Sequence, residues 1–221
     1  MSAETTERVP APWTLRGDAH LLLARAPRQP AAQLAGGARV RSGGLGLLAF
    51  IRYTDSNVGP YDELLWLAPW GLRVGPFRAH SVTHIYVSSE QSRRNGRLEW
   101  GIPKQLGRFD VEPAGSRGLR VRVSAAAGPV AEFEITTFAR SIAVSADALP
   151  RVALELQQVL DGQLFRVLPR LRGRLHRARF SRLAAHASTL LELDDSRSLG
   201  AVSLLGFTLV FPRAELRALG D

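Results

Sequence analysis

The sequence predicts an α+β fold that is mainly antiparallel β, with a closed or nearly closed sheet and few helices. Three observations lead to this prediction. Short apolar segments of strand length recur along the chain, Gly, Pro, Asn or Ser separates them, and only one long segment has helical spacing. A chain of 221 residues can bury a substantial core, and it fits one domain better than two.

The elements can be followed in order from the N-terminus. Residues 1–12 are polar and contain proline, and we expect a flexible tail there ahead of a single domain over residues 13–221. The apolar run 20–26 predicts a strand, and the Ala-, Gly-, Pro- and Arg-rich stretch 28–44 predicts a loop. Further strands are predicted at 47–53, 62–67, 81–87, 109–112, 119–124, 130–136 and 142–144, and then within 165–193 and 204–211.

Helix is expected in fewer places. Segment 149–160 has apolar residues at three- and four-residue spacing, and Asp161-Gly162 would end a helix there. Shorter helical turns are expected at 89–94 and at 213–219.

The composition excludes several classes of function. The chain has no cysteine, which excludes disulfides, thiolate zinc sites and cysteine nucleophiles. No apolar run approaches the roughly 20 residues that span a bilayer, and the N-terminus lacks a signal-like apolar core. We therefore expect a cytoplasmic protein with no membrane partner. The net charge of +9 favours anionic partners, so its location along the chain has to be considered.

One basic residue differs from all the others. Of the 29 basic residues, 28 are arginine and one, Lys104, is lysine. A guanidinium cannot be deprotonated in a protein, whereas a lysine ammonium can lose its proton and act as an amine nucleophile. Lys104 is therefore the candidate nucleophile of the chain.

The residues around Lys104 suggest a partly dry environment. Segment 96–107 reads GRLEWGIPKQLG, in which Pro103 fixes the backbone and Trp100, Ile102 and Leu106 supply apolar contacts. Because burial disfavours the ammonium, we expect the pKa of Lys104 to be lowered.

The sequence resembles the acetoacetate decarboxylase family. The run 86–107, YVSSEQSRRNGRLEWGIPKQLG, is similar to the signature of that family, including its Pro-Lys-x-Leu-Gly element. Segments 59–66, GPYDELLW, and 206–216, GFTLVFPRAEL, resemble two further stretches of the family.

The resemblance implies a cofactor-independent carbon–carbon lyase, a homo-oligomer, that acts on a small keto acid and is most simply a β-keto acid decarboxylase. Lys104 would form the Schiff base, and Glu63 would act as a general acid or base or would orient the substrate. Residues expected to bind substrate, with an arginine fork for its carboxylate, are Arg16, Arg97, Gln105, Tyr61 and Trp100. No metal and no cofactor is expected.

Two positions depart from the family pattern. Gln105 stands where the well-known decarboxylases have a second lysine, and Ile51 stands where a second glutamate is expected. Without the neighbouring ammonium, burial alone, or an inward-pointing Arg97 or Arg108, would have to lower the pKa of Lys104. An alternative is therefore a protein of the same fold that binds a small molecule without turnover.

A third hypothesis is an arginine-driven anion or nucleic-acid binder. In segment 165–182, Arg170, Arg172 and Arg174 alternate with apolar or small residues, so one face of a strand would be cationic. Only two phenylalanines accompany the charge, whereas nucleic-acid grooves usually interleave more aromatic residues, and this hypothesis is less favoured.

His80 and His84 would share one face of a strand, as metal ligands do. No third ligand lies near them in the sequence, so a structural or surface role is preferred to a metal site.

Overall fold

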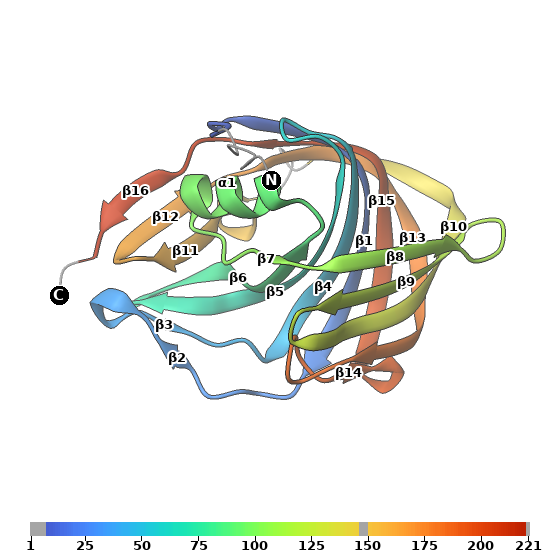
Figure 1. Cartoon of the computed structure of the whole chain (residues 1–221), viewed down its shortest axis with the longest axis horizontal. Helices are drawn as coiled ribbons and strands as arrows, with labels where there is room; N and C mark the ends of the chain where they lie inside the picture. Colours follow the sequence, from blue (N-terminus) through green and yellow to red (C-terminus); the bar gives the residue numbers. More distant parts are fainter. Residues whose placement is uncertain (1–7, 146–149, 220–221) are drawn as a thin grey trace, which may run out of the picture.

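The protein is described by a computed structural model that covers residues 8–145 and 150–219. Strands dominate this part of the chain, which contains a single α-helix, α1 (Glu90–Trp100) (Figure 1). The strands are β1 (Trp13–Ala26), β2 (Ala32–Gln33), β3 (Arg39–Val40), β4 (Gly44–Asp55), β5 (Tyr61–Val74), β6 (Phe77–Val87), β7 (Gln105–Leu106), β8 (Arg108–Pro113), β9 (Gly118–Ala125), β10 (Gly128–Ser145), β11 (Leu156–Leu160), β12 (Gln163–Val167), β13 (Arg170–Ala185), β14 (Leu193–Asp194), β15 (Ser198–Phe211) and β16 (Glu215–Ala218). Short 3-10 helices occupy Ala35–Gly37, Arg151–Ala153 and Asp195–Arg197. Within the described ranges, no helix has the length and apolar character needed to cross a membrane.

The strands form one large sheet whose main path runs β16-β12-β11-β6-β5-β4-β1-β15-β13-β10-β9-β8. Neighbours on this path are antiparallel except β6 and β11, which pair in parallel through His80 and Leu156. The prediction of a mainly antiparallel fold is confirmed. The path has two ends, at β16 and β8, so the sheet curls without closing.

The central strands are buried on both faces, which explains why their sequences are continuously apolar rather than alternating. On β4, Leu48 and Phe50 are fully buried in a cluster shared with β9, β10 and β13. Ala49 and Ile51 point to the other face, into a second cluster formed with α1, β12 and β15. The candidate site described below lies on this second face.

The segments predicted as strands at 47–53, 62–67, 81–87, 109–112 and 119–124 all lie within longer strands. Segments 130–136 and 142–144 belong to one strand, β10. The stretch 28–44, predicted as a loop, contains the short strands β2 and β3 and one 3-10 helix, and its last residue, Gly44, begins β4.

Helix α1 is longer than the predicted turn at 89–94. Ser89 caps its N-terminus by accepting a hydrogen bond from the Ser92 backbone N–H at 3.2 Å, and Gly101 ends it with a left-handed φ of 63°. Its buried side chains are mostly small or polar, so the sequence has no apolar periodicity there. These buried residues are Ser92, Asn95, Gly96, Glu99 and Trp100.

The helix predicted at 149–160 is wrong, although Leu149 itself lies outside the described residues. Residues Leu156–Leu160 form β11, which pairs with β12. Asp161 and Gly162 have φ values of 50° and 75°, so the Asp-Gly pair is the two-residue turn of a hairpin rather than a helix end. The helical turn predicted at 213–219 is also wrong, because Glu215–Ala218 pairs with β12 as β16.

Residues 8–12, expected to belong to a flexible tail, make specific contacts with α1. Arg8 donates to Glu99 Oε1 at 2.9 Å, and the Val9 N–H donates to Asn95 Oδ1 at 2.9 Å. The Ala11 N–H donates to the second oxygen of Glu99 at 3.1 Å. In the structure this segment is therefore packed against the domain, while residues 1–7 are not described.

The burial of His20 on β1 predicts a loss of stability in acid. Its Nδ1 is 2.7 Å from Ser203 Oγ, and burial lowers its pKa to about 4, with Asp18 acting in the opposite direction. Because an unfolded histidine titrates near 6.5, the unfolded chain takes up this proton first as the pH falls. We expect the free energy of unfolding to decrease by up to about 3 kcal/mol between pH 6.5 and 4 on this account. Urea denaturation at several pH values should show a smaller decrease in the free energy of unfolding for His20→Gln than for wild type.

The control variant His186→Gln, at an exposed position, should show the same decrease as wild type. If the free energy of unfolding of His20→Gln fell with pH as steeply as that of wild type, the prediction would be contradicted.

Candidate active site

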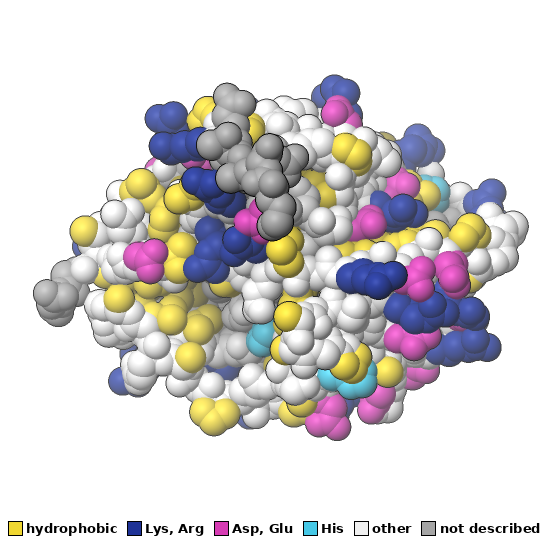
Figure 2. Space-filling model, in the orientation of Figure 1, with side chains coloured by type: hydrophobic (Ala, Val, Ile, Leu, Met, Phe, Trp, Pro, Cys, Tyr) yellow, Lys and Arg dark blue, Asp and Glu magenta, His cyan; other side chains and the backbone are white. Residues whose placement is uncertain are grey.

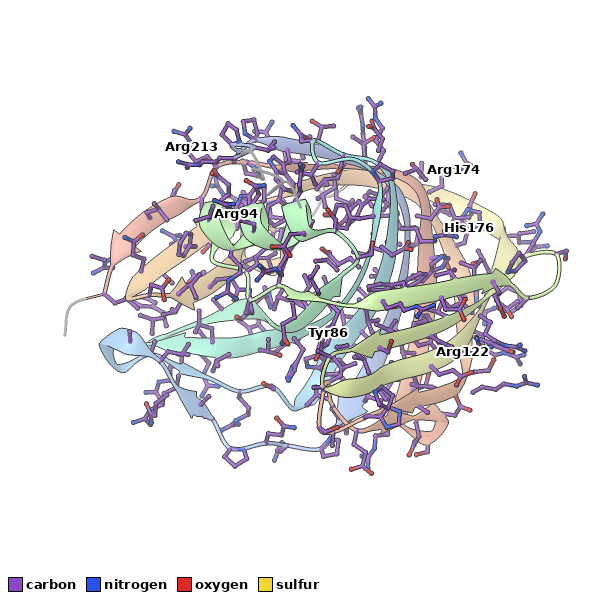
Figure 3. The ribbon with its side chains drawn as sticks, in the orientation of Figure 1. Tyr86, Arg94, Arg122, Arg174, His176 and Arg213 are labelled. Carbon is purple, nitrogen blue, oxygen red and sulfur yellow. The ribbon has the colours of Figure 1, made fainter. Side chains whose placement is uncertain are left out.

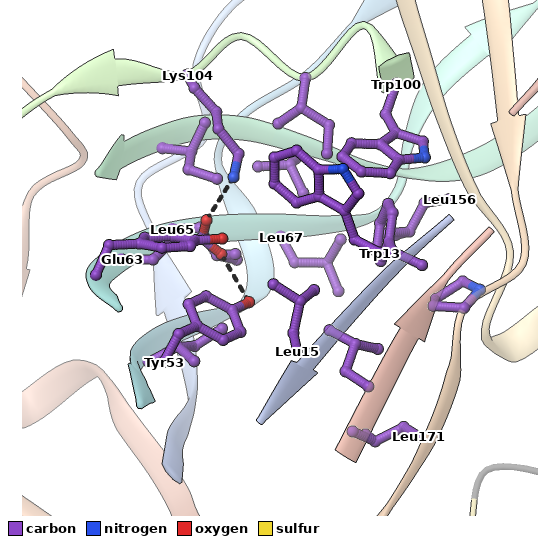
Figure 4. Close-up of a pocket in the computed structure, with 18 residues that line it drawn as sticks. Trp13, Leu15, Tyr53, Glu63, Leu65, Leu67, Trp100, Lys104, Leu156 and Leu171 are labelled. Carbon is purple, nitrogen blue, oxygen red and sulfur yellow. Dashed lines mark hydrogen bonds and ion pairs between the residues drawn. The ribbon is translucent and has the colours of Figure 1, made fainter. Parts of the chain in front are cut away.

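A cavity of about 240 Å³ lies on the face of the sheet that α1 covers (Figure 4). Its walls come from β1, β4, β5, β6, β13 and β15, together with the end of α1, the segment that follows α1, Leu156 at the start of β11 and Pro169 before β13. Fourteen of its 18 lining residues are apolar, and the four others are Tyr53, Tyr61, Glu63 and Lys104. An apolar enclosure of this kind strengthens every electrostatic interaction inside it.

Lys104 and Glu63 form a buried ion pair in this cavity. The Lys104 Nζ lies 2.8 Å from Glu63 Oε2, and each side chain is only 5% exposed. Nζ also donates to Ser92 Oγ at 2.9 Å. The amine is thus held by two polar partners within an otherwise apolar wall.

The pKa of Lys104 is raised, which corrects the expectation that it would be lowered. Burial lowers the pKa, but the Glu63 carboxylate and Tyr61 together outweigh burial. The residues next to Lys104 in the sequence indicate burial and nearby cations, but they do not show that an acidic side chain contacts the amine. Lys104 is therefore a paired ammonium in this structure.

Two tyrosines complete the polar part of the cavity. The Tyr53 hydroxyl donates to Glu63 Oε1 at 3.3 Å, so both oxygens of the carboxylate are engaged. Lys104 Nζ lies 5.3 Å from the centre of the Tyr61 ring, within the range of a cation–π contact. Burial raises the pKa of Tyr53, and it raises the pKa of Tyr61 to about 12, so both phenols remain protonated at neutral pH.

The sheet register explains how these side chains meet. Tyr61, Glu63, Leu65 and Leu67 alternate along β5 and all face the cavity, as residues two apart on a strand must. Ile51 on β4 is directly opposite Glu63. The position at which the family pattern has a second carboxylate thus contributes an apolar wall here.

Lys104 reaches the cavity because Gly96 leaves room for it. A Cβ at position 96 would lie 2.7 Å from both Cδ and Cε of Lys104. Those atoms cannot easily move, because Nζ is bonded to Glu63 and Ser92. Glycine is therefore required where α1 passes the lysine stem.

We expect Gly96→Ala to displace the amine from Glu63 and to lower Schiff-base formation at Lys104 by about tenfold or more, since a misplacement of 1 Å can cost about 10²-fold. The measurement is the fraction of protein trapped by borohydride with a keto substrate. Gly200→Ala is the matched control, because a Cβ at that position meets nothing within 4 Å. Equal trapping in both variants would show that Gly96 is not a spatial requirement.

The predicted site residues separate into two groups. Lys104, Glu63, Tyr61 and Trp100 line the cavity. Three others do not: Arg16, Arg97 and Gln105.

Arg16, Arg97 and Gln105 each lie outside the cavity. Arg16 follows the cavity-facing Leu15 on β1, so it points outward, where it lies 3.6 Å from Asp55. Arg97 lines a separate surface hollow. Gln105 is the neighbour of Lys104 and is exposed. The structure therefore places no arginine on the cavity wall, and the expected arginine fork for a substrate carboxylate is absent from its described lining.

Sequence reasoning did not find Ser92, Tyr53 or Gly96 as parts of the site. Ser92 lies 2.9 Å from the amine, but an isolated serine on a polar helix gives no signal in the sequence. Tyr53 was detectable in principle, because it lies two residues after Ile51 on the same strand and therefore on the same face.

His80 and His84 do not form a metal site within the part of the chain that the structure describes. His80 Nε2 lies 3.1 Å from the Val152 carbonyl, and His84 Nδ1 lies 3.1 Å from Thr83 Oγ1. The register of β6 against β5 shifts between His84 and Val82, so the two histidines do not follow the simple alternation of a regular strand. Over residues 8–145 and 150–219, no group of three or more potential ligands could hold a metal ion.

The basic strand β13 has the predicted alternation. Arg170, Arg172 and Arg174 are exposed, and the residues between them are half-buried. Arg174 and His176, on the right in Figure 3, line a hollow that is separate from the Lys104 cavity. This face therefore takes no part in the Lys104 site.

The fold and the site together define a mainly β protein with an amine–carboxylate pair inside an apolar cavity. The chain belongs to the acetoacetate decarboxylase family, since the sequence profile described as "Acetoacetate decarboxylase (ADC)" matches residues 36–197. No match was found among curated protein sequences.

Solved structures show the same fold at low sequence identity. Acetoacetate decarboxylase from Legionella pneumophila subsp. pneumophila str. Philadelphia 1 has a TM-score of 0.68 at 15% identity, covering 99% of this chain and 98% of that one. An acetoacetate decarboxylase-like enzyme from Sphingomonas wittichii RW1 has a TM-score of 0.63 at 13% identity, covering 99% and 97%. The enduracididine biosynthesis enzyme MppR has a TM-score of 0.64 at 14% identity, covering 99% and 91%. The fold is therefore shared by proteins whose names describe different activities.

Proposed function

We propose that this protein is a Schiff-base-forming lyase in which Lys104 attacks the carbonyl group of a small keto acid. The observation that carries the proposal is the position of Lys104 Nζ inside an apolar cavity, 2.8 Å from Glu63 Oε2. Because the chain has no second lysine, this is its sole side-chain amine.

The raised pKa of Lys104 means that the amine must lose a proton before it can attack. Glu63 is within direct reach as the base. Moving the proton from Nζ to Oε2 converts two buried charges into two neutral groups, and the apolar walls favour that neutral pair more than water would. The ion pair then serves as a reservoir from which the neutral amine forms.

The following steps use the same two groups. The amine adds to the carbonyl carbon, the carbinolamine loses water, and a protonated imine remains on Lys104. With a β-keto acid, carbon dioxide leaves while the bonding electrons move toward the iminium nitrogen, which gives an enamine. Protonation of the enamine at carbon and hydrolysis by water release the ketone and regenerate the amine. Protonated Glu63 is placed to supply a proton in these steps.

The cavity walls favour a substrate whose body is apolar. The polar groups at hand are Lys104, Glu63 and the hydroxyls of Tyr53 and Tyr61. A substrate carboxylate would therefore lie beside the iminium and the phenols, with no guanidinium to stabilise it. A carboxylate poorly solvated in this way is easier to lose as neutral carbon dioxide.

A second candidate function is reversible binding of a small carbonyl compound without turnover. The raised pKa of Lys104, together with Gln105 in place of a second lysine, favours this candidate, because the amine is held as an ammonium by Glu63. Aldol or dehydration chemistry on the same imine is a further outcome that the trapping experiment below would reveal through its products.

Borohydride trapping tests the proposal directly. The protein is incubated with a panel of keto acids and matched neutral ketones, reduced, and analysed by intact-mass and peptide mass spectrometry. We expect a substrate-dependent adduct on Lys104, with carbon dioxide release for at least one β-keto acid. An adduct without carbon dioxide or any other product would support the binder. No adduct on Lys104 with any carbonyl compound would refute both, and the α-amino group provides the internal control for non-specific reaction.

A further inference from the structure

A second hollow, of about 310 Å³, lies at the end of β5 that is remote from Glu63, where the β2–β3 pair joins the sheet (Figure 1). Five exposed arginines line it, and the described residues of its wall include no acidic side chain. These arginines are Arg28, Arg39, Arg41, Arg73 and Arg78.

Three of the arginines form a ladder across three strands. Arg39 on β3 is directly opposite Arg73 on β5, which in turn is directly opposite Arg78 on β6. Directly opposed residues of antiparallel strands point to the same face, with Cβ atoms about 4.5–5.5 Å apart. Their neighbours Leu72 and Ala79 are buried on the other face.

The ladder has no carboxylate to neutralise it. None of the five arginines forms an ion pair with any residue in 8–145 or 150–219. Arg39 contacts the Gln33 side chain and Arg73 contacts the Gly75 carbonyl, both of which are uncharged. Like charges placed directly opposite one another destabilise a sheet, so a bound anion would relieve a repulsion already present in the fold.

Other arginines of the same sheet are either neutralised or separated from one another. Arg170 and Arg172 on β13 also form no ion pair with the described residues, but they lie opposite the uncharged Val210 and Thr208 on β15. Arg122 on β9 lies within 4 Å of three carboxylates, those of Asp110, Glu112 and Glu132. Figure 2 shows dark blue and magenta side chains intermixed on the right of the molecule, where Arg122 is labelled in Figure 3.

An aromatic side chain stands beside the ladder. Trp70 lines the same hollow, is 45% exposed, and has a φ of 57°, which is unusual for a residue other than glycine. The pairing of β5 with β6 is interrupted between Ala68 and Leu72, so Trp70 lies in an irregular part of β5 that is not in register with β6. The ring of His80 packs against it at 4.4 Å. An indole held in this way is a suitable surface for a planar base.

We propose that this hollow binds a nucleoside diphosphate, or the nucleoside diphosphate portion of a larger molecule. The phosphate groups lie on the Arg39–Arg73–Arg78 ladder, where planar guanidinium groups donate paired hydrogen bonds to phosphate oxygens. The base stacks on Trp70. Arg28 and Arg41 close the rim. The site is independent of the Lys104 cavity and of the reaction proposed there.

Isothermal titration calorimetry on the full chain tests this site with ADP, AMP, pyrophosphate and orthophosphate. We expect saturable binding of ADP, at least tenfold weaker binding of AMP, and a marked loss of ADP affinity as the salt concentration rises. Arg73→Gln, at the centre of the ladder, should weaken ADP binding at least tenfold. Trp70→Ala should weaken ADP binding but leave the affinity for pyrophosphate unchanged.

Arg122→Gln is the matched control, because it removes an exposed arginine of the same sheet that carboxylates already neutralise. It should leave ADP binding at the wild-type value. Failure to bind ADP, equal losses in Arg73→Gln and Arg122→Gln, or equal affinities for ADP and pyrophosphate would each overturn the proposal. So would tighter Arg73-dependent binding of a single-stranded oligonucleotide, or a change of oligomeric mass in Arg73→Gln without any ADP binding. Borohydride trapping at Lys104 should be unaffected by Arg73→Gln, which separates this site from the proposed reaction.

Discussion

Replacing Lys104 with methionine is expected to abolish the borohydride-trapped adduct and to lower any turnover of a keto acid by at least about 10⁴-fold, as loss of a covalent nucleophile does elsewhere. No other side chain of the protein can replace it, because every other basic residue except histidine is arginine. The measurements are intact mass after reduction, for the adduct, and product formation, for the turnover.

Lys104→Arg tests the need for the amine separately from the need for a positive charge. A guanidinium keeps a cation beside Glu63 but cannot form a Schiff base, so the adduct should be lost while most of the folding stability remains. Retention of turnover in both variants would mean that the chemistry does not pass through this nitrogen. Loss of turnover with a retained adduct in Gly96→Ala would instead point to a need for precise orientation after the imine has formed.

Removing the partner of the amine should have the largest effect on stability. Glu63→Gln leaves Lys104 buried with only Ser92 and the tyrosines around it, and we expect the free energy of unfolding to fall by about 3–5 kcal/mol. The loss has an upper limit, because the amine can discharge itself. Releasing its proton at pH 7 from an ordinary pKa of 10.5 costs about 5 kcal/mol.

A double variant shows whether the loss arises from the unpaired charge. Glu63→Leu with Lys104→Met removes both charges, and it should be more stable than Glu63→Gln alone, because apolar pairs often replace buried ion pairs with little cost. Urea denaturation at neutral pH measures both. The exposed pair Glu90–Arg93 on α1 gives the control, in which Glu90→Gln should change stability by less than about 1 kcal/mol.

The pH dependence of this pair has a definite sign. The folded pKa of Lys104 lies above its unfolded value, so the stabilisation is complete below 10.5 and is lost as the pH rises through the folded value. The difference between wild type and Glu63→Gln should therefore be present at neutral pH. It should shrink as the pH rises toward and beyond 10.5, because discharging the unpaired amine of the variant costs less at each higher pH. A difference that vanished near neutrality would contradict the raised pKa.

The sequence predicted the strands well because burial of an apolar face is a local signal. Segment 149–160 was predicted as a helix because the spacing of Leu156, Val159 and Leu160 fits a helix as well as a strand. The Asp161-Gly162 pair is equally typical of the end of a helix and of the turn between two strands. Only the pairing of β11 with β12 distinguishes these cases. Helix α1 was underestimated for the opposite reason, since the side chains it buries are polar or small.

The candidate site could be predicted only where chemistry restricts the residue type. Lys104 stood out because it is the single lysine among 29 basic residues, and Glu63 was indicated by the resemblance of segment 59–66 to the family. The direction of Arg16 depends on strand phase at the end of β1, and the pKa of Lys104 depends on a partner 41 positions away in the sequence. Neither follows from local spacing, and the net charge gave no indication that arginines would gather in an unpaired ladder.

The burial of a solitary lysine also makes one peptide bond a reporter of opening around the cavity. An endoprotease that cleaves only after lysine has a single peptide bond to cut, at the 5% exposed Lys104, and would yield fragments 1–104 and 105–221. Cleavage requires that this segment leave its pocket, so the digestion rate under native conditions follows the population of opened molecules. A ligand covalently attached to that side chain would make the bond resistant even after opening, so one gel lane would register both occupancy and unfolding.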